Sequence, residues 1–280
     1  LLLCPIAIAA QGWNDNVYKQ IEQRVKQPEF PNRSFIITKY GAESKLSAAK
    51  NQIAINKAIL SCSKAGGGKV IIPSGIWNTG AITLKSNVNL VVEKGAHIIF
   101  AFDTSLYPIV KTRWEGMDCM NYQPCIYAYG EKNIAITGEG TIDGNGSVNT
   151  WWKMCGKDWF KAKEKITENQ NVGRPKLFEF VENGTPIEKR NMKGLGMRPQ
   201  LINLYKCEGI LIENVTLLNS PFWVMHPLLS KNITVRGVKV WNNGPNGDGC
   251  DPESCEDVII EGCNFHTGDD CIAIKSGRNA

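Results

Sequence analysis

Five short segments of this chain of 280 residues resemble one another. Each has a strand of alternating apolar residues, a Gly or Asn turn and a second short strand, and they begin at Asn87, Lys132, Glu208, Lys231 and Glu256. Glu208 and Lys231 are 23 residues apart, and Lys231 and Glu256 are 25 apart. A period in the twenties with mostly strand in each repeat is typical of a solenoid whose coils stack in parallel. We therefore expect an all-β fold, a right-handed parallel β-helix.

An antiparallel sandwich would also show regularly spaced strands. Two observations favour the solenoid: the repeats resemble each other residue by residue, and a helix precedes them that is suited to cover an open coil edge. This N-terminal capping helix is expected before the glycines at 66–68, with one apolar face made by Ile53, Ala54, Ala58, Ile59 and Cys62.

The β-helix domain is expected over residues 34–280. A segment from about 151 to 198, rich in Lys, Glu and Asn, interrupts the repeats and is expected to form a long loop with some helix beside the solenoid. Residues 1–10 are apolar and end in small residues, like the remnant of a secretory signal peptide, which indicates a secreted or periplasmic protein; a buried first strand is the alternative. This stretch is too short to span a bilayer.

The hydrophobic content of 42% is that of a globular protein, and the formal charge of +5 comes from scattered Lys and Arg. Without a basic patch or a reader motif, we expect no nucleic-acid binding. Ten cysteines are present, but none is arranged as C-x-x-C, so we expect no metal site of that kind. The pairing of the cysteines stays open.

Two acidic turns occur late in the chain, in "GPNGDGCDPESC" (residues 244–255) and "FHTGDDCIAIKSG" (residues 265–277). The two Gly-Asp pairs are 21 positions apart, so on stacked coils Asp248 should lie near Asp269 and Asp270, with Asp251 close by. Ionised carboxylates at close range repel, which raises at least one pKa. A protonated and an ionised carboxyl together can cleave a glycosidic bond, by donating to the leaving oxygen and by activating water.

Three glycines flank these carboxylates, namely Gly247, Gly249 and Gly268. We expect them to let the backbone turn sharply and to leave room for a substrate. Two other interpretations remain. Gly-Asp pairs are common in solvated turns, where the Asp caps its own backbone. Four carboxylates from neighbouring coils would also suit a calcium ion.

"NGDGCD" followed one coil later by "GDDC" resembles the paired acidic motifs of polygalacturonases, glycoside hydrolase family 28. The first motif of that family usually reads N-T-D-G-x-D, and Gly247 stands here where Thr is usual. "YGAES", "GGGKVIIPSG", "GEGTIDGNG", "RPQLINLYKC" and "NSPFWVMHP" resemble bacterial members. The resemblance covers roughly Ser34 to Ala280, and it implies a β-helix hydrolase of pectin that inverts the anomeric configuration without a cofactor.

Carried over by position, the resemblance implies that Asp269 is the general acid and that Asp248 and Asp270 hold and deprotonate the attacking water. Asn246 and Asp251 would support the first motif. An inverting pair is expected to leave about 6.5–9.5 Å between its carboxyl groups for that water.

The family also carries a G-H-G turn and an Arg-x-Lys in later coils, and by spacing both fall after Ala280. The chain is therefore expected to be C-terminally incomplete, poorly stable and nearly inactive as given. Among the histidines present, His226 with Trp223 is the best candidate for a substrate contact, against Trp223 simply packing a coil. His266 is expected either to line the cleft or to fill a coil corner, and His97 to be structural.

The sequence thus predicts an exported, monomeric polygalacturonase that acts on α-1,4-linked galacturonate in pectic polysaccharide, without membrane insertion. Exo attack is favoured because the long insert could block one end of the cleft. One alternative is a calcium-dependent pectate lyase on the same fold, in which a Lys or Arg would abstract the proton. The other is a non-catalytic carbohydrate-binding solenoid that keeps aromatic platforms such as Trp223 and Trp241.

Overall fold

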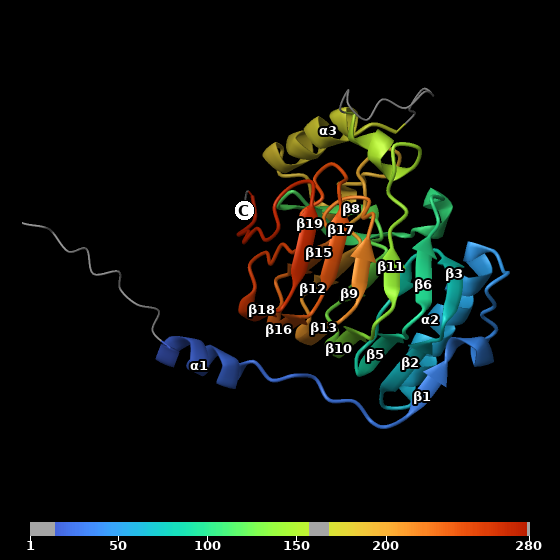
Figure 1. The fold of residues 1–280 in the computed structure, drawn as a ribbon. Helices are drawn as coiled ribbons and strands as arrows, with labels where there is room; N and C mark the ends of the chain where they lie inside the picture. The colour runs from blue at the N-terminus through green and yellow to red at the C-terminus, as the bar shows by residue number, and fades with distance from the viewer. Residues whose placement is uncertain (1–14, 157–167, 279–280) are drawn as a thin grey trace, which may run out of the picture.

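Three parallel sheets run along the molecule in the computed structural model, which describes residues 15–156 and 168–278 (Figure 1). The first sheet contains, in order, β1 (Ser34–Ile36), β2 (Gly68–Ile72), β5 (Val88–Val92), β10 (Lys132–Thr137), β13 (Glu208–Glu213), β16 (Lys231–Arg236) and β18 (Glu256–Glu261). The second contains β3 (Gly75–Thr79), β6 (Ala96–Phe100), β11 (Thr141–Asp143), β14 (Thr216–Leu218), β17 (Lys239–Asn242) and β19 (Asn264–Thr267).

The third sheet contains β4 (Ile82–Thr83), β9 (Ile126–Tyr129), β12 (Ile202–Tyr205) and β15 (Met225–Leu228). Parallel bridges continue it through two further coils, from Met225 to Cys250 and from Cys250 to Ile272. Each coil contributes one strand to each sheet, and the strands stack on those of the neighbouring coils. The chain is a right-handed parallel β-helix, so the predicted fold class is confirmed.

The register of the first sheet is the one that the repeats predict. Lys132 lies opposite Glu208, Glu208 opposite Lys231, and Lys231 opposite Glu256. Along this row Glu208 pairs with Lys132 Nζ at 3.0 Å and with Lys231 Nζ at 3.3 Å. Inside the coils, stacked apolar side chains such as Ile134, Ile210 and Ile233 are almost completely buried. Each such side chain stabilises the fold by about 1.5–3 kcal/mol relative to exposure, which no single coil could gain alone.

A second set of equivalent residues, one from each coil, stacks where the chain enters the first sheet. Its residues have left-handed backbone conformations in successive coils, with φ of 65° at Asn87, 54° at Asn133, 69° at Gly209, 59° at Asn232 and 53° at Asp257. Asn, Asp and Gly tolerate this conformation better than other residues. The Asn133 amide also donates to Asn87 Oδ1 at 3.2 Å. The Gly or Asn turn between the two strands of each repeat is left-handed as well, at Gly95, Gly138, Asn214, Gly237 and Gly262.

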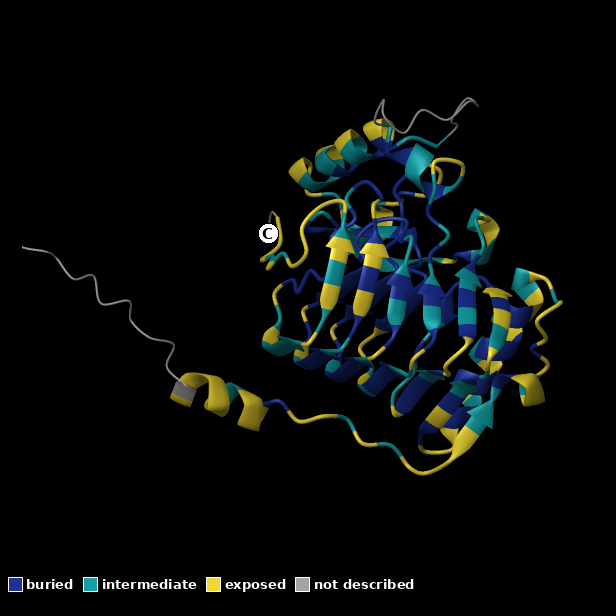
Figure 2. Cartoon of the chain, viewed as in Figure 1, coloured by how far each residue is buried: buried dark blue, intermediate teal, exposed yellow. Residues whose placement is uncertain are grey.

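The capping helix is α2 (Ala48–Lys64), which packs on the first coils (Figure 1). It buries Ala54, Ala58, Ile59 and Cys62, as expected, but Ile53 is 69% exposed and Ile55 takes its place on the buried face. The reason is geometric: Ile55 lies three, four and seven positions before the other buried residues at 58, 59 and 62, whereas Ile53 points away. Figure 2 shows the buried interior enclosed by the strands and this helix.

An N-terminal strap, residues 15–33, precedes the first strand. It begins with α1 (Asp15–Arg24) and then runs beneath the first sheet to β1 (Figure 1). Arg24 Nη2 lies 2.9 Å from Asp257 Oδ1 at the start of β18, and Asn133 Nδ2 donates to Glu29 O at 2.8 Å. The strap thus contacts coils far along the solenoid. The proposed signal-peptide remnant, residues 1–10, lies outside the described residues.

The insert between β11 and β12 is described at residues 151–156 and 168–198. It contains η3 (Trp151–Cys155), α3 (Gln170–Glu182) and η5 (Ile187–Lys189), and α3 lies beyond the ends of the second-sheet strands (Figure 1). Among the described residues, no helix combines the length and the apolar character needed to cross a bilayer.

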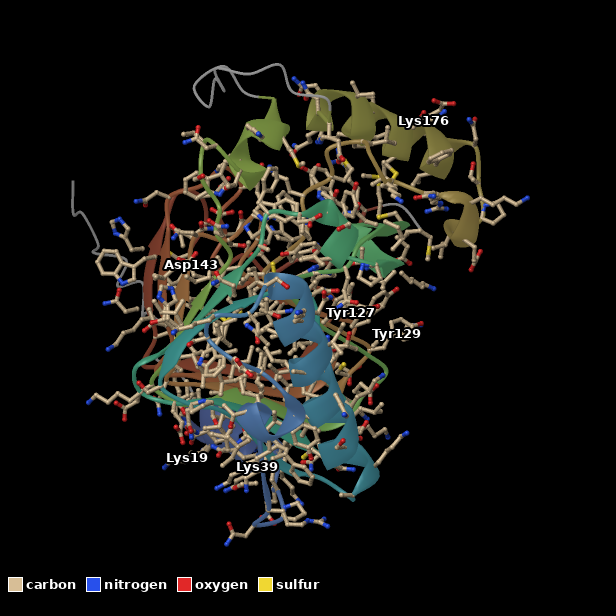
Figure 3. The ribbon with its side chains drawn as sticks, turned by 90° about the vertical axis from the view of Figure 1, so that its right-hand side faces the viewer. Lys19, Lys39, Tyr127, Tyr129, Asp143 and Lys176 are labelled. Atoms are coloured by element: carbon tan, nitrogen blue, oxygen red, sulfur yellow. The ribbon has the colours of Figure 1, made fainter. Side chains whose placement is uncertain are left out.

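An antiparallel hairpin of β7 (Ile109–Trp114) and β8 (Met117–Tyr122), which was not predicted from the sequence, follows η2 (Thr104–Leu106). It packs on the outer face of the third sheet, where Tyr127 Oη donates to Lys111 O at 2.6 Å and Gln200 Nε2 donates to Arg113 O at 2.9 Å. Figure 3 shows Tyr127 of the third sheet and Asp143 of the second on different sides of the solenoid. The hairpin therefore covers one side of the molecule.

Candidate functional site

The two acidic turns stack directly on each other. Gly249 N donates to Asp270 O at 2.9 Å, and Cys250 N donates to Cys271 O at 3.0 Å. A Cβ atom at Gly249 would lie 2.6 Å from Cys271 O, and one at Gly268 would lie 2.9 Å from the backbone of Asn243. These glycines therefore permit close stacking of the turns.

The expected reason for the glycines was a different one, namely sharp turns and room for a substrate. Gly247, Gly249 and Gly268 all lie outside the left-handed region of backbone conformation. A Cβ at Gly247 would meet Gly244 O at 2.7 Å, again a contact within the protein. A larger residue at Gly249 or Gly268 would disturb the packing of one turn on the next, and one at Gly247 would disturb the first turn itself.

The carboxylates of the two turns lie close together, as predicted. One oxygen from each of Asp248, Asp269 and Asp270 lies within 4.8 Å of the others. These oxygens are nearer to one another than the 6.5–9.5 Å expected for the two carboxyl groups of an inverting pair. The reason is the stacking itself, because neighbouring coils of a parallel sheet are only about 4.8 Å apart.

The environments of these carboxylates differ. Asp248 is 4% exposed, whereas Asp269 and Asp270 are exposed. Burial raises the pKa of Asp248, and Lys275, whose Nζ lies 3.1 Å from Asp248 Oδ2, opposes that rise. The site thus contains a shielded carboxylate beside a cation and two solvated carboxylates next to it.

Asp251 is completely buried on the outer side of the third sheet, next to the core residue Cys250. Lys275 Nζ lies 3.5 Å from Asp251 Oδ2, but within the described part of the chain neither carboxylate oxygen has a hydrogen-bond partner. Burial, reinforced by the nearby Asp248, raises the pKa of Asp251 to about 9. Asp251 is therefore protonated at neutral pH.

Lys275, which was not predicted from the sequence, connects the two buried carboxylates. It pairs with Glu253 across a parallel bridge of the third sheet, and its Nζ lies 4.3 Å from the centre of the Trp223 ring. Although burial opposes its charge, Asp251 and Asp248 raise the pKa of Lys275. The alternation in "CIAIKSG" would have placed this lysine on the same outer face as Glu253, one coil later.

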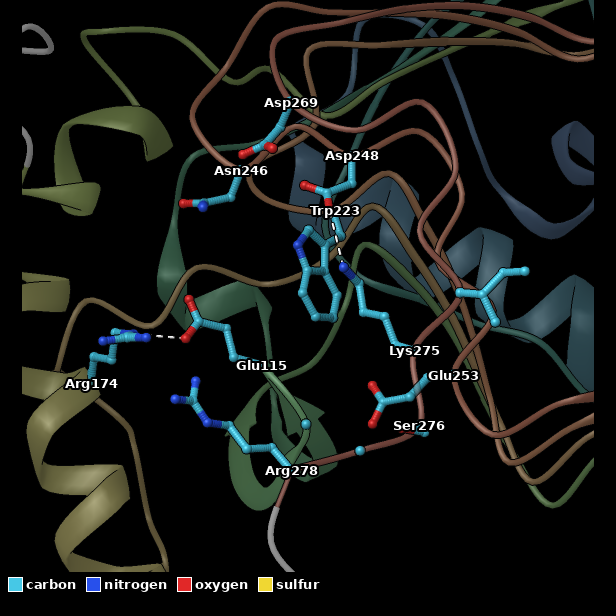
Figure 4. A pocket seen from close by; sticks show the side chains of 13 residues that line it. Glu115, Arg174, Trp223, Asn246, Asp248, Glu253, Asp269, Lys275, Ser276 and Arg278 are labelled. Carbon is cyan, nitrogen blue, oxygen red and sulfur yellow. Dashed lines mark hydrogen bonds and ion pairs between the residues drawn. The ribbon is translucent and has the colours of Figure 1, made fainter. Parts of the chain in front are cut away.

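A cavity of about 500 Å³ opens beside the turns (Figure 4). One side carries Asn246, Asp248, Asp269, Trp223 and Lys275. The opposite side carries Glu115 of the β7–β8 turn, Arg174 of α3, and Arg278. Arg174 Nε lies 2.7 Å from Glu115 Oε2, so the hairpin and the insert together form this wall (Figure 4). The cavity therefore presents three cationic side chains near its carboxylates.

Asn246 is held in place by a buried arginine, Arg198, which was likewise not predicted from the sequence. Arg198 donates to Asn246 Oδ1 at 2.8 Å, to Gln170 Oε1 at 2.7 Å and to the carbonyl oxygens of Pro221 and Pro245 at 2.9 and 2.8 Å. Burial lowers the pKa of Arg198 to about 10. The signal available was the "RPQ" stretch, because a charged residue before a buried strand needs several polar partners.

His226 has no exposed surface, so the predicted direct substrate contact is wrong for this residue. Its Nε2 lies 2.9 Å from Glu253 Oε2, and its Nδ1 lies 3.1 Å from Asn203 Nδ2. Burial lowers the pKa of His226, which favours a neutral ring. Trp223 stands edge-on to it, 5.0 Å between ring centres, and itself lines the cavity. Trp223 therefore both packs a coil and faces the cavity.

His266 is exposed on β19, where its ring lies 4.8 Å from that of Trp241 on β17. Both residues belong to the second sheet, and neither lines the cavity. Cys250, Cys255, Cys263 and Cys271, near the acidic turns, carry free thiols.

Fold and site together define a class of protein: a right-handed parallel β-helix with paired acidic turns on adjacent coils that open into one cavity. Residues 180–280 match the sequence model of "Glycosyl hydrolases family 28". The chain belongs to this family.

Two curated relatives and one solved structure show how far the similarity extends. The chain is 32% identical to a "Probable polygalacturonase" of Vitis vinifera over 81% of this chain and 41% of that protein. It is 26% identical to an "Exo-poly-alpha-D-galacturonosidase" of Dickeya chrysanthemi over 86% and 42%. An exopolygalacturonase structure from Thermotoga maritima aligns with a TM-score of 0.88 and 40% identity over 94% of this chain and 59% of that one. The chain thus spans about two fifths of the length of these curated relatives.

Proposed function

We propose that this protein is a glycoside hydrolase that cleaves α-1,4-galacturonosyl linkages of polygalacturonan in pectic polysaccharide. The observation that carries the proposal is the set of Asp248, Asp269 and Asp270, whose oxygens lie within 4.8 Å of one another beside the cavity. Lys275 and two arginines line the same cavity and suit an anionic sugar. Family membership and the names of the relatives support the same substrate.

In the proposed mechanism, Asp269 donates its proton to the leaving glycosidic oxygen while Asp248 and Asp270 orient a water molecule. Asp248 takes a proton from that water as its oxygen bonds to the anomeric carbon and the glycosidic bond breaks. Asp269 lines the cavity, where a substrate can reach it, and the contact of Asp248 with Lys275 favours the ionised form of Asp248. Asn246 and Asp251 support the first turn, and no cofactor takes part.

Inversion is part of the proposal, and the close spacing of the carboxylates makes it worth testing directly. Proton NMR of the first product formed from a galacturonan oligomer distinguishes the two anomers. We expect the β-anomer to appear first. Initial appearance of the α-anomer would assign a retaining mechanism instead.

Exo attack is supported by the wall that the hairpin turn and α3 form together. Glu115 and Arg174 stand across the cavity from Asp248 and Asp269, where a longer chain would need to continue (Figure 4). We expect monogalacturonate as the early product from polygalacturonate. A ladder of oligomers at early times would indicate endo attack. We further propose that the protein acts as an exported monomer, which cell fractionation and sedimentation would test.

The decisive experiment measures the release of reducing ends from polygalacturonate by the protein as its gene encodes it. Asp269→Asn should abolish most of this release, whereas Asp103→Asn, a matched exposed control outside the cavity, should not. Products that absorb in the ultraviolet, lost on addition of a chelator, would favour the calcium-dependent lyase. Binding of galacturonan without turnover would favour a non-catalytic solenoid.

A further inference from the structure

We propose that Lys275 is a positioning residue that keeps Asp248 ionised for its work as the base, while Asp251 behind it holds a proton. This inference rests on the proposed function, because it assigns a task to Asp248 within that reaction.

The contacts of Lys275 carry the inference. Its Nζ lies 3.1 Å from Asp248 Oδ2 and 3.5 Å from Asp251 Oδ2, so one ammonium group faces two carboxyls. The lysine side chain is 24% exposed, and those of Asp248 and Asp251 are 6% and 0% exposed. Little solvent is therefore available to stabilise a negative charge on either carboxyl, and the ammonium group is the nearest compensation.

The position of Lys275 is fixed from two directions. Its backbone is bound into the third sheet, where Lys275 N donates to Pro252 O at 3.0 Å and Ser254 N donates to Lys275 O at 2.8 Å. Its side chain lies over the Trp223 ring, with 4.3 Å between Nζ and the ring centre, where a cation is attracted to the aromatic face. The ammonium group is thus held at Asp248, and Trp223 acquires a role in holding it there.

Other charged groups face this pair. Asp269 and Asp270 approach Asp248 from the next turn, and Asp269 raises the pKa of Asp248. Glu253, adjacent to Lys275 in the sheet, is already paired with His226 and with Arg113, whose Nη1 lies 2.9 Å from Glu253 Oε1. Glu115, Arg174 and Arg278 lie across the cavity, with Glu115 paired to Arg174. The neighbouring cations on the hairpin and α3 are engaged with other carboxylates, so in the described part of the chain Lys275 is the cation in contact with Asp248.

This arrangement gives the two buried carboxyls, Asp248 and Asp251, different protonation states. Among residues 15–156 and 168–278, one ammonium group serves both, and it lies nearer to Asp248. Asp251 lies deeper, has no hydrogen bond to any of these residues, and keeps its proton at neutral pH. A neutral Asp251 removes one repulsion from Asp248, so the lysine and the buried acid act in the same direction.

The test compares kcat and KM against pH on polygalacturonate for the wild type, Lys275→Met and Lys275→Arg. Methionine keeps the stem over Trp223 but removes the charge. An opposite charge at this distance lowers a carboxyl pKa by about 1–3 units, so its loss should move the acidic limb of the kcat profile upward by about one to three pH units. Lys275→Arg should keep the limb near that of the wild type. Lys239→Met, on the exposed face of β17, is the matched control and should change neither parameter.

The kcat and KM profiles of the Lys275 variants either support or overturn the proposed role of Lys275. An unmoved acidic limb in Lys275→Met, or a rise in KM at constant kcat, would overturn the proposal and assign the lysine to substrate binding. Thermal unfolding followed by circular dichroism shows whether the variants fold. If Lys275→Met does not fold, Lys275→Gln takes its place. The proposal would also be overturned if the acidic limb of the kcat profile moved as far in Lys275→Arg as in Lys275→Gln. Absence of hydrolysis by the wild type and Lys239→Met would instead remove the proposed function itself.

Discussion

The two acidic turns share a Gly-Asp-x-Cys pattern but not an environment. In the first, Asp248 is nearly buried and touches Lys275; in the second, Asp269 and Asp270 are exposed. Both turns line the cavity, through Asn246 and Asp248 in the first and Asp269 in the second, but the first turn is also covered by the coil that stacks on it. The comparison teaches that a repeated motif on stacked coils can provide two different carboxyls, because the chemistry depends on what covers each copy.

The largest expected effect is on kcat, and it distinguishes the general acid Asp269 from the general base Asp248. Asp269→Asn and Asp248→Asn should each lower kcat on polygalacturonate by about 10²–10⁴-fold. On an aryl galacturonide with a good leaving group, Asp269→Asn should recover most of the activity, since such a group departs without protonation. Asp248→Asn should not recover. Equal recovery of both variants would break the distinction between the turns.

A smaller effect tests the packing of one turn on the other. Gly249→Ala places a Cβ 2.6 Å from Cys271 O, and we expect the free energy of unfolding to fall by about 1–3 kcal/mol. Gly130→Ala is the control: its φ is 68° but nothing lies within 4 Å of the added atom, so only the conformational cost of about 1–2 kcal/mol applies. Urea denaturation measures both. A cost at Gly249 below that at Gly130 would show that the turns can move apart.

A third prediction concerns the buried acid beside the first turn. The folded-state pKa of Asp251 is raised to about 9, so its contribution to stability is full at low pH and is lost as the pH rises toward that value. The wild type should lose up to about 1.4 kcal/mol of unfolding free energy per pH unit from this group between about pH 5 and 8. Asp251→Asn, which does not titrate, should lack that slope. Parallel curves for the two proteins would show that Asp251 is ionised in the folded state.

Much of the fold follows from the sequence because a solenoid repeats its inward residues. The spacing of Glu208, Lys231 and Glu256 predicts the strand register that the structure confirms. The repeat carries no information on what covers the outer face, so the β7–β8 hairpin, and with it Glu115 in the cavity wall, was missed. The burial of His226 has the same cause, since that hairpin and its neighbours cover the third sheet.

Within the site, the carboxylates could be predicted and their partners could not. Coil spacing alone brings Asp248 to Asp269 and Asp270. Lys275 and Arg198 reach the site through long side chains whose direction depends on packing against Trp223 and Phe222. Such contacts follow from side-chain conformation, which the period of a sequence does not specify.

The contact between the N-terminal strap and the last strand of the first sheet has a consequence for biosynthesis. Arg24 and Asp257 are 233 positions apart. As the chain leaves the ribosome, each coil can settle on the one before it, because coils interact mainly with their neighbours. Glu29 of the strap can bind Asn133 once β10 is made, but Arg24 at the end of α1 must wait for a partner that is made much later. The docking of α1 on β18 therefore reports that the intervening coils have been assembled.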